Sequence, residues 1–160
     1  MPEHSVRPAL PPLPDSPFTE RPRALAALRL SCLTSVTTSP GRQRSAIQSA
    51  ADRLGLTPVA EASDLGISAR DTSPFERPSL SLWLRRPHEC DAVVWAHVDR
   101  AVRSVAHMTE LIAWGRQHAR TLVFGTPEAE GPLVVTPQAN GSTIRRCMDV
   151  DHPTVHGHRS

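Results

Sequence analysis

The chain contains no lysine and no tyrosine among its 160 residues, and aromatic residues make up only 4% of it. All 18 basic side chains are therefore arginine. Without lysine, Schiff-base chemistry and nucleotide binding by a P-loop are excluded, because both depend on a lysine amine. With so few aromatic residues, a core must be built from aliphatic side chains. The hydrophobic fraction of 39% is sufficient for one packed domain of this length.

The chain also has no long hydrophobic run, little net charge and few cysteines. No apolar stretch approaches the roughly 20 residues of a membrane span, and the N-terminus lacks the apolar centre of a signal peptide. The formal net charge of +2 excludes a histone-like protein but leaves room for a local basic site. Cys32, Cys90 and Cys147 form an odd and widely spaced set. They argue against a disulfide framework and predict a reducing, cytoplasmic environment.

The distribution of proline predicts where the chain folds. Seven of the 16 prolines lie in the first 22 residues, so residues 1–22 are expected to form a disordered leader. Residues 23–126 are the expected folded domain. Residues 127–160 lose hydrophobic periodicity and are expected to form an irregular, disordered tail, in which only Pro132–Thr136 could be a strand.

Hydrophobic patterns in residues 23–126 predict strands that alternate with helices. The expected strands are Ala24–Ser31, Pro58–Ala62, Asp91–Val98 and Thr121–Gly125. The expected helices run from a Ser39-Pro40 start to Gly55, over Leu80–Arg86, and along a face shared by Val105, Met108, Leu111 and Ile112. A long loop is expected at Ser63–Pro78. This order predicts an α/β fold of three layers, with helices on both faces of a mainly parallel central sheet of four to five strands.

The strand ends carry side chains that could act together on a phosphodiester. In open α/β sheets, sites form at the carboxyl ends of the strands. The expected ends carry Arg29, Ser31, Asp64, Asp99, Arg100 and, one turn further on, Arg103. Arginine binds phosphate oxygens through two parallel hydrogen bonds, and a serine hydroxyl held among arginines can attack phosphorus without a metal ion. Taken singly, these residues also have structural interpretations as turn residues, helix caps or a solvated helix face.

Three segments, in this order, resemble the catalytic domain of the serine recombinases, which include resolvases, invertases and large phage integrases. The segments are LRLSCLTSVTTSPGRQRSAI, with an Arg-x-Ser strand end and a glutamine at the start of the next helix; SDLGISARDTSPFERPSL, with an acidic loop that runs into Arg-Pro; and DAVVWAHVDRAVRSVAHMTELIAW, with Asp-Arg-x-x-Arg. The resemblance covers residues 24–125 and implies a resolvase-like catalytic core. The long serine-to-glutamine loop is most similar to that of the large serine integrases of actinobacteria and phages.

This resemblance implies DNA strand cleavage and exchange, that is, site-specific recombination, through a covalent 5′-phosphoserine link to DNA. Ser31 would be the nucleophile of this reaction. Arg29, Arg100 and Arg103 would hold the scissile phosphate.

The resemblance also implies supporting residues and partners. Gln43 and Arg77 would support the phosphate and the serine loop, while Asp64 and Asp99 would orient arginines or influence proton transfer. The implied partners are double-stranded DNA and either further copies of the chain, as a dimer or tetramer, or a full-length recombinase. No cofactor, metal ion or ATP would be required.

The sequence departs from the family pattern after Thr126. No apolar period there is long enough for the family's dimerisation helix, and the tyrosine that usually precedes Arg-x-Ser is absent. The alternative is therefore a truncated, catalytically incompetent remnant that acts at most as a module binding DNA or a recombinase. A receiver-like regulatory domain would need a lysine at a strand end, which this chain lacks.

Several further residues with reactive side chains are expected to have no role in the chemistry. Four potential metal ligands lie near the C-terminus: Cys147, His152, His156 and His158. Their spacing matches no closed zinc pattern, so no metal site is expected. His97 and His107 are interpreted as packing or surface residues, and Cys32 as a small buried hydrophobe.

Overall fold

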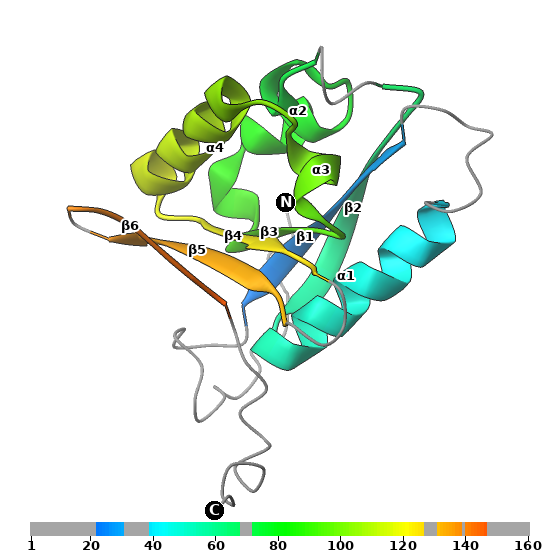
Figure 1. Cartoon of the computed structure of the whole chain (residues 1–160), viewed down its shortest axis with the longest axis horizontal. Helices are drawn as coiled ribbons and strands as arrows, with labels where there is room; N and C mark the ends of the chain where they lie inside the picture. The colour runs from blue at the N-terminus through cyan, green and yellow to red at the C-terminus, as the bar shows by residue number, and fades with distance from the viewer. Residues whose placement is uncertain (1–21, 31–38, 68–71, 127–130, 139, 147–160) are drawn as a thin grey trace, which may run out of the picture.

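The chain folds around a six-stranded sheet with the strand order β2-β1-β3-β4-β5-β6. The computed structural model describes residues 22–30, 39–67, 72–126, 131–138 and 140–146 (Figure 1). Its strands are β1 (Arg23–Leu30), β2 (Thr57–Leu65), β3 (Ala92–Trp95), β4 (Thr121–Phe124), β5 (Leu133–Gln138) and β6 (Gly141–Arg146). Strands β1 to β4 are parallel, whereas β5 is antiparallel to β4 and β6 to β5. The predicted α/β fold with a mainly parallel sheet is confirmed, with one strand more than expected.

Helices cover both faces of the sheet and give the three predicted layers. Helix α1 (Pro40–Leu54) lies on one face, and α2 (Leu80–Leu84), α3 (Val98–Ala101) and α4 (Val105–His118) lie on the other (Figure 1). Two single-turn 3₁₀ helices, η2 (Pro74–Glu76) and η3 (Pro87–Glu89), flank α2 in the sequence. Because parallel strands need crossover connections, α1 links β1 to β2, and the α2 region links β2 to β3.

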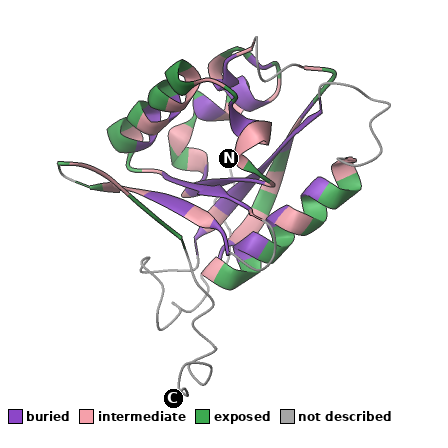
Figure 2. Ribbon diagram, in the orientation of Figure 1, coloured by how far each residue is buried: buried purple, intermediate pink, exposed green. Residues whose placement is uncertain are grey.

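Strand β1 is buried along almost its whole length because helices pack on both of its faces. Ala24 and Leu28 pack into the cluster on the α1 side, and Leu25 packs into the cluster on the side of α2 and α4. Figure 2 shows the inner strands as the most buried part of the molecule, with exposed residues mainly on the outer faces of the helices. The core is largely aliphatic, as the composition predicts, with Trp95 stacked on Phe124 at 5.2 Å between ring centroids.

The ends of α1 agree with the sequence prediction. At the start, the Ser39 side chain accepts a hydrogen bond from the Arg42 N–H, and Pro40 lies in the first turn, where its missing N–H is not needed. At the other end, Gly55 adopts a left-handed conformation (φ 71°), and its N–H donates to the Ala51 carbonyl.

The end of β3 differs from the prediction. The sequence predicts a strand to Val98, but β3 ends at Trp95, where its pairing with β1 also ends. Asp99 and Arg100 consequently lie in the single turn of α3, and Arg103 lies in the link to α4 rather than one turn further along the same helix.

Two other elements differ from the prediction because pairing and burial override sequence pattern. Within the predicted Ser63–Pro78 loop, β2 continues to Leu65 because its backbone still pairs with β1, and η2 forms a further turn. Val105 belongs to the apolar face predicted for this helix, but it is 83% exposed, whereas Leu111 on that face is fully buried.

The segment after Thr126 contains more regular structure than predicted. The strand predicted at Pro132–Thr136 is confirmed as β5. Strand β6 lies in the range predicted to be irregular. Its sequence, GSTIRR, lacks the apolar alternation that would predict a strand, and the strand is defined instead by backbone pairing with β5.

Several predicted features lie outside the described residues. These are almost all of the leader, Ser31 and Cys32, and the four potential metal ligands after Arg146. Within the described ranges, no helix combines the length and the apolar character needed to cross a membrane.

Candidate functional site

The strand order places a topological switch point at the carboxyl edge of the sheet, between β1 and β3. Strand β2 lies on one side of β1 and β3 on the other, so the direction of winding reverses between them. Open α/β sheets bind ligands at such a switch point. β1 pairs with β3 only from Ala24 to Ala27, so among the described strands none pairs with the last residues of β1 on this side.

Gln43, in the first turn of α1, binds the backbone of β1 where none of the described strands pairs with it on this side. Its side-chain oxygen accepts the Arg29 backbone N–H at 3.1 Å, and its side-chain nitrogen donates to the Arg29 carbonyl at 2.9 Å. Because Gln43 and Arg29 are both buried, these bonds form away from water. They hold the end of β1 against the start of α1.

The Arg29 side chain contacts backbone rather than solvent. Its guanidinium donates to three carbonyl oxygens: Nε to Arg100 at 3.3 Å, Nη1 to Ile67 at 2.8 Å and Nη2 to Asp99 at 3.1 Å. Arg29 is only 2% exposed. It therefore ties β1 to the segment after β2 and to α3.

Arg77, directly after η2, donates to the same end of α3. Its Nη1 donates to the Arg100 carbonyl at 2.9 Å, and its Nη2 donates to the Ala101 carbonyl. A helix leaves its last carbonyls without internal partners. Arg29 and Arg77 together supply those partners for α3. The Arg77 Nε is also buried, and it has no hydrogen-bond partner within the described part of the chain.

Burial lowers the pKa of both arginines to about 10. Repulsion from Arg100 is the next cause for Arg29, and repulsion from Arg29 is the next cause for Arg77. Attraction to Asp99 and Asp64, respectively, acts in the opposite direction. A pKa of about 10 leaves both guanidiniums charged at neutral pH. Two positive charges therefore lie beneath this edge of the sheet.

Helix α3 carries a chain of polar contacts that leads back to β1. Arg100 donates through Nη1 to the Arg29 carbonyl at 3.4 Å, and its Nε lies 3.3 Å from Asp99 Oδ1. His97 caps the start of α3 and places Nδ1 3.2 Å from the same carboxylate oxygen. The Arg100 side chain is mostly buried, whereas those of Asp99 and His97 are partly exposed. The contacts thus run from solvent to the end of β1.

Asp64 is opposite Arg29 in the β1–β2 register, but its carboxylate binds backbone amides. One oxygen accepts the Ser79 N–H at 2.6 Å, and the other accepts the Leu80 N–H at 3.0 Å. Asp64 is buried, so it fixes the start of α2 to the end of β2. Its influence on the arginines is electrostatic, through the raising effect on the pKa of Arg77.

The structure thus brings together six of the eight predicted site residues: Arg29, Gln43, Asp64, Arg77, Asp99 and Arg100. Arg103 is exposed in the link between α3 and α4, close enough to lower the pKa of Arg29 by repulsion. Ser31 lies in residues 31–38, outside the described residues, and directly follows Leu30 in the sequence.

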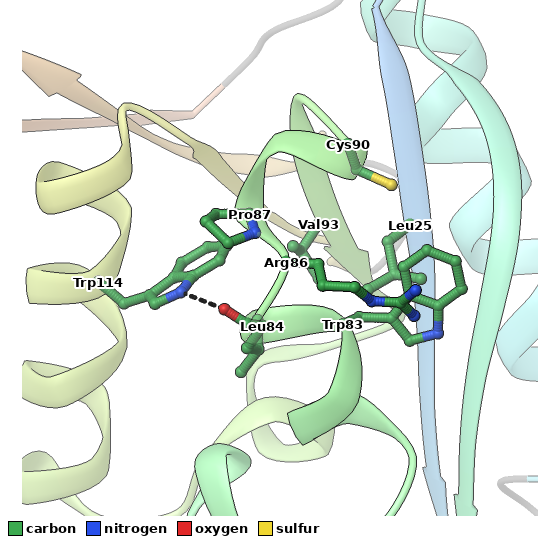
Figure 3. A pocket seen from close by; sticks show the side chains of 8 residues that line it. All are labelled: Leu25, Trp83, Leu84, Arg86, Pro87, Cys90, Val93 and Trp114. Carbon is green, nitrogen blue, oxygen red and sulfur yellow. Dashed lines mark hydrogen bonds between the residues drawn. The ribbon is translucent and has the colours of Figure 1, made fainter. Parts of the chain in front are cut away.

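A small internal pocket lies beside α2, away from this edge (Figure 3). It is lined by Leu25, Trp83, Leu84, Arg86, Pro87, Cys90, Val93 and Trp114. Its free volume is close to that of one water molecule, and the Trp114 Nε1–H donates to the Leu84 carbonyl at its wall. The pocket therefore belongs to the core. Across the described ranges, no three His, Cys, Asp or Glu side chains gather in a group that could hold a metal ion.

One residue of this site, His97, is interpreted from the sequence as a packing or surface residue and not as a site residue. A histidine two positions before an aspartate is the spacing of a side chain that caps a short helix and can contact that aspartate. This signal is weak in the sequence because β3 is predicted to continue past it. With β3 ending at Trp95, His97 instead begins α3.

Comparisons with known proteins identify a matching family and similar structures. The family model described as "Resolvase, N terminal domain" matches residues 24–150, well over half of the chain. No curated protein gives a significant match. Among solved structures, the chain is similar to the N-terminal catalytic domain of TP901-1 integrase, with a TM-score of 0.57 and 19% identity over 64% of this chain and 76% of that one.

A second solved structure is also similar to this chain. It is the C-terminal catalytic domain of ISC1926 TnpA, an IS607-like serine recombinase, with a TM-score of 0.53 and 19% identity over 62% of this chain and 67% of that one. At this identity, both likenesses concern the fold.

Proposed function

Because the chain belongs to the family of resolvase N-terminal domains, whose model matches residues 24–150, we propose that it performs site-specific DNA recombination. In this proposal, Ser31 attacks a DNA phosphodiester and forms a covalent 5′-phosphoserine link. Arg29, Arg100 and Arg103 stabilise the scissile phosphate during the attack. The proposed partners are double-stranded DNA and further copies of the chain, and the scarcity of cysteine favours a cytoplasmic location.

The observation that carries this proposal is the position of Arg100. Its helix, α3, is a single turn, yet two buried arginines bind its last carbonyls, and Asp99 contacts the Arg100 side chain itself. Arg100 therefore lies at the end of β1, beside Arg29, which is two positions before Ser31 in the sequence. Gln43 supports the same arrangement from α1 by holding the Arg29 backbone.

The proposed chemistry is a transesterification that needs no external energy source. A bond forms between the serine oxygen and phosphorus while the bond from phosphorus to the 3′ oxygen breaks. Arginine charges stabilise the negative charge that develops on the phosphate oxygens, which is the main catalytic contribution in phosphoryl transfer. The phosphoserine conserves one phosphodiester bond, so a 3′ hydroxyl can later attack it and rejoin the strands.

The test is formation of a covalent protein–DNA adduct, detected on a denaturing gel after incubation with supercoiled DNA. We expect the unchanged chain to form the adduct and the Ser31→Ala variant to form none, because alanine has no nucleophilic oxygen. Ser45→Ala is the matched control, since Ser45 is exposed on α1. It should form the adduct at the rate of the unchanged chain.

Two results would contradict the proposal in different ways. An adduct that persists in Ser31→Ala would show that another residue is the nucleophile. Absence of any adduct from the unchanged chain, together with retained DNA binding in a gel-shift assay, would favour the alternative of a binding module without catalytic activity.

A further inference from the structure

The amino ends of the parallel strands lie at the edge of the sheet opposite the candidate site, and they carry two arginines. Arg23 begins β1, and Arg120 directly precedes β4. Asp91, directly before β3, lies between them: its Oδ2 is 3.4 Å from the Arg23 Nε, and its Oδ1 is 3.3 Å from the Arg120 Nη1. Because two guanidiniums share one carboxylate, the starts of these three neighbouring strands keep an excess positive charge.

Both arginines also hold the segment that follows α2. Arg23 donates through Nη2 to the His88 carbonyl at 3.1 Å. Arg120 donates through Nη1 to the Cys90 carbonyl at 2.9 Å. Since His88 lies in η3 and Cys90 directly follows it, η3 is fixed against the starts of β1 and β4.

Helices α2 and α4 end at this same edge and bring three further arginines to it. The Trp114 Nε1–H, near the end of α4, donates to the carbonyl of Leu84, the last residue of α2, at 2.9 Å (Figure 3). This bond places the two helix ends side by side. Arg85 and Arg86 directly follow α2, Arg116 lies in the last turn of α4, and all three are exposed.

The five arginines of this edge are named here the amino-edge surface: Arg23, Arg85, Arg86, Arg116 and Arg120. The same segments, residues 85–91 and 116–120 together with Arg23, contain two acidic residues, Glu89 and Asp91. Their formal charge is therefore +3, which exceeds the +2 of the whole chain. Among the residues that the structure describes, Arg85 and Arg116 form no ion pair, and Arg86 lies over the Trp83 ring at 4.9 Å. The charge of this surface is thus only partly neutralised within the protein.

The phosphate backbone of DNA matches this surface better than a protein does. Arginine binds phosphate oxygens through two parallel hydrogen bonds and stays charged at neutral pH. Protein–DNA interfaces are more polar and more positive than protein–protein interfaces, whose centres are apolar and depleted in charge. A second copy of the chain, docked symmetrically, would bring the same positive charge against this surface.

We propose that the amino-edge surface binds the phosphate backbone of a DNA segment separate from the one at the candidate site. The eight residues of β1 span roughly 25 Å between the two edges, so one chain contacts DNA at both. Phosphate contacts carry no sequence information, so this surface holds DNA of any sequence. Binding here requires no reaction and therefore goes beyond the proposed function.

The decisive variant is the double replacement Arg85→Gln and Arg116→Gln. Both side chains are exposed, and neither forms a hydrogen bond or ion pair within the described ranges that the fold would lose. Binding to duplex DNA of random sequence is measured by fluorescence anisotropy from about 50 to about 200 mM salt. Since each phosphate contact contributes about −0.9 to the slope of log K against log salt, we expect this slope to become shallower by about 2. Affinity at about 100 mM salt should fall roughly 10- to 100-fold.

The matched control is Arg44→Gln together with Arg53→Gln. It also removes two exposed arginines, but from α1 on the other face of the sheet, where Arg44 is paired with Glu61 at 2.8 Å. The control should keep the salt slope of the unchanged chain. At saturating DNA, the Arg85 and Arg116 double variant should also form the Ser31-dependent adduct at the unchanged rate, because its surface lies at the opposite edge from the site.

Three results overturn the inference. They are absence of DNA binding by the unchanged chain, an equal loss of affinity in the control, and an unchanged salt slope in the double variant, which would leave an acidic protein as the partner of this surface. Should the double variant fail to fold by circular dichroism, modification of the unchanged chain by phenylglyoxal, which reacts with arginine, decides. Bound DNA must then protect Arg85, Arg86 and Arg116 in mass spectra, and full modification of all three overturns the inference. Failure of the proposed function appears separately, as absence of the adduct while this DNA binding remains.

Discussion

Arg29 shows how a side chain with an expected ligand role can also be part of the scaffold. Its guanidinium has five N–H groups, and three of its nitrogens donate to backbone carbonyls in this structure. The strand pattern predicts on which side of β1 this residue lies, but it does not predict the carbonyls, which come from segments about 40 and 70 residues away. Arg77 uses its donors in the same manner.

Gln43 offers the clearest test at the scale of one residue. Gln43→Met keeps the length of the side chain but leaves the Arg29 N–H buried without this acceptor and deprives the Arg29 carbonyl of one donor. We expect the free energy of unfolding to fall by about 2–4 kcal/mol, since each unsatisfied buried polar group costs about 1–3 kcal/mol. Urea unfolding measures the change.

The control for this variant is Gln48→Met on the same helix. Gln48 is exposed and donates to Asp52 one turn further on. Its replacement should change the free energy of unfolding by less than about 0.5 kcal/mol. If both variants change the free energy of unfolding by the same amount, the hydrogen bonds between Gln43 and Arg29 stabilise the fold no more than an exposed hydrogen bond does.

At the scale of elements, the sequence predicts helix ends well where local chemistry defines them. Ser39, Pro40 and Gly55 specify both ends of α1 without help from the rest of the chain. The end of β3 depends instead on how far β1 pairs with it, which involves residues far apart in the sequence. The motif containing Asp99 and Arg100 can be recognised in the sequence. Its placement on a separate single turn cannot be predicted, because it depends on where β3 ends.

Gly125 controls how closely β3 and β4 approach at their carboxyl ends. A Cβ atom at this position would lie 2.5 Å from the Ala96 carbonyl oxygen, and the Gly125 N–H donates to the Trp95 carbonyl at 2.8 Å. Gly125→Ala must therefore push the two strand ends apart. We expect it to lower the free energy of unfolding by about 1–3 kcal/mol in urea titrations.

A second glycine provides the comparison for this effect. At Gly41, in the first turn of α1, an added Cβ would have its nearest neighbouring atom 4.0 Å away. Gly41→Ala should leave stability unchanged or raise it by up to about 1 kcal/mol, because alanine favours helix. If Gly125→Ala were equally harmless, the close approach of the strands would not constrain the fold.

For the whole molecule, the structure extends the sheet beyond the boundary predicted at residue 126. Strands β5 and β6 continue the sheet from β4, and α4 contacts both of them. Val135 and Leu133 on β5 pack into the same core cluster as Leu111 and Phe124. The family match, which reaches residue 150, covers this region as well. We therefore propose that the folded domain includes β6.

A chain that ends at Thr126 tests this extent of the domain. Removal of β5 and β6 leaves β4 with an unpaired edge and uncovers the apolar side chains that Val135 and Leu133 contact. We expect such a chain to unfold at lower urea concentration and to aggregate in size-exclusion chromatography, since uncovered edge strands pair between molecules. A chain that ends at Arg146 should match the full chain. If a chain ending at Thr126 unfolds cooperatively and stays monomeric, the folded domain ends at residue 126, as the sequence predicts.

The single turn of α3 has a consequence for how the site could be observed in solution. A helix of four residues does not hold its shape through its own hydrogen bonds, because the nucleating turn is unfavourable in isolation. The Val102 N–H, which donates to the Val98 carbonyl, therefore stays protected from exchange with deuterium only while Arg29 and Arg77 remain bound to the end of α3. Its exchange rate reports whether the two arginines hold the helix or have released it.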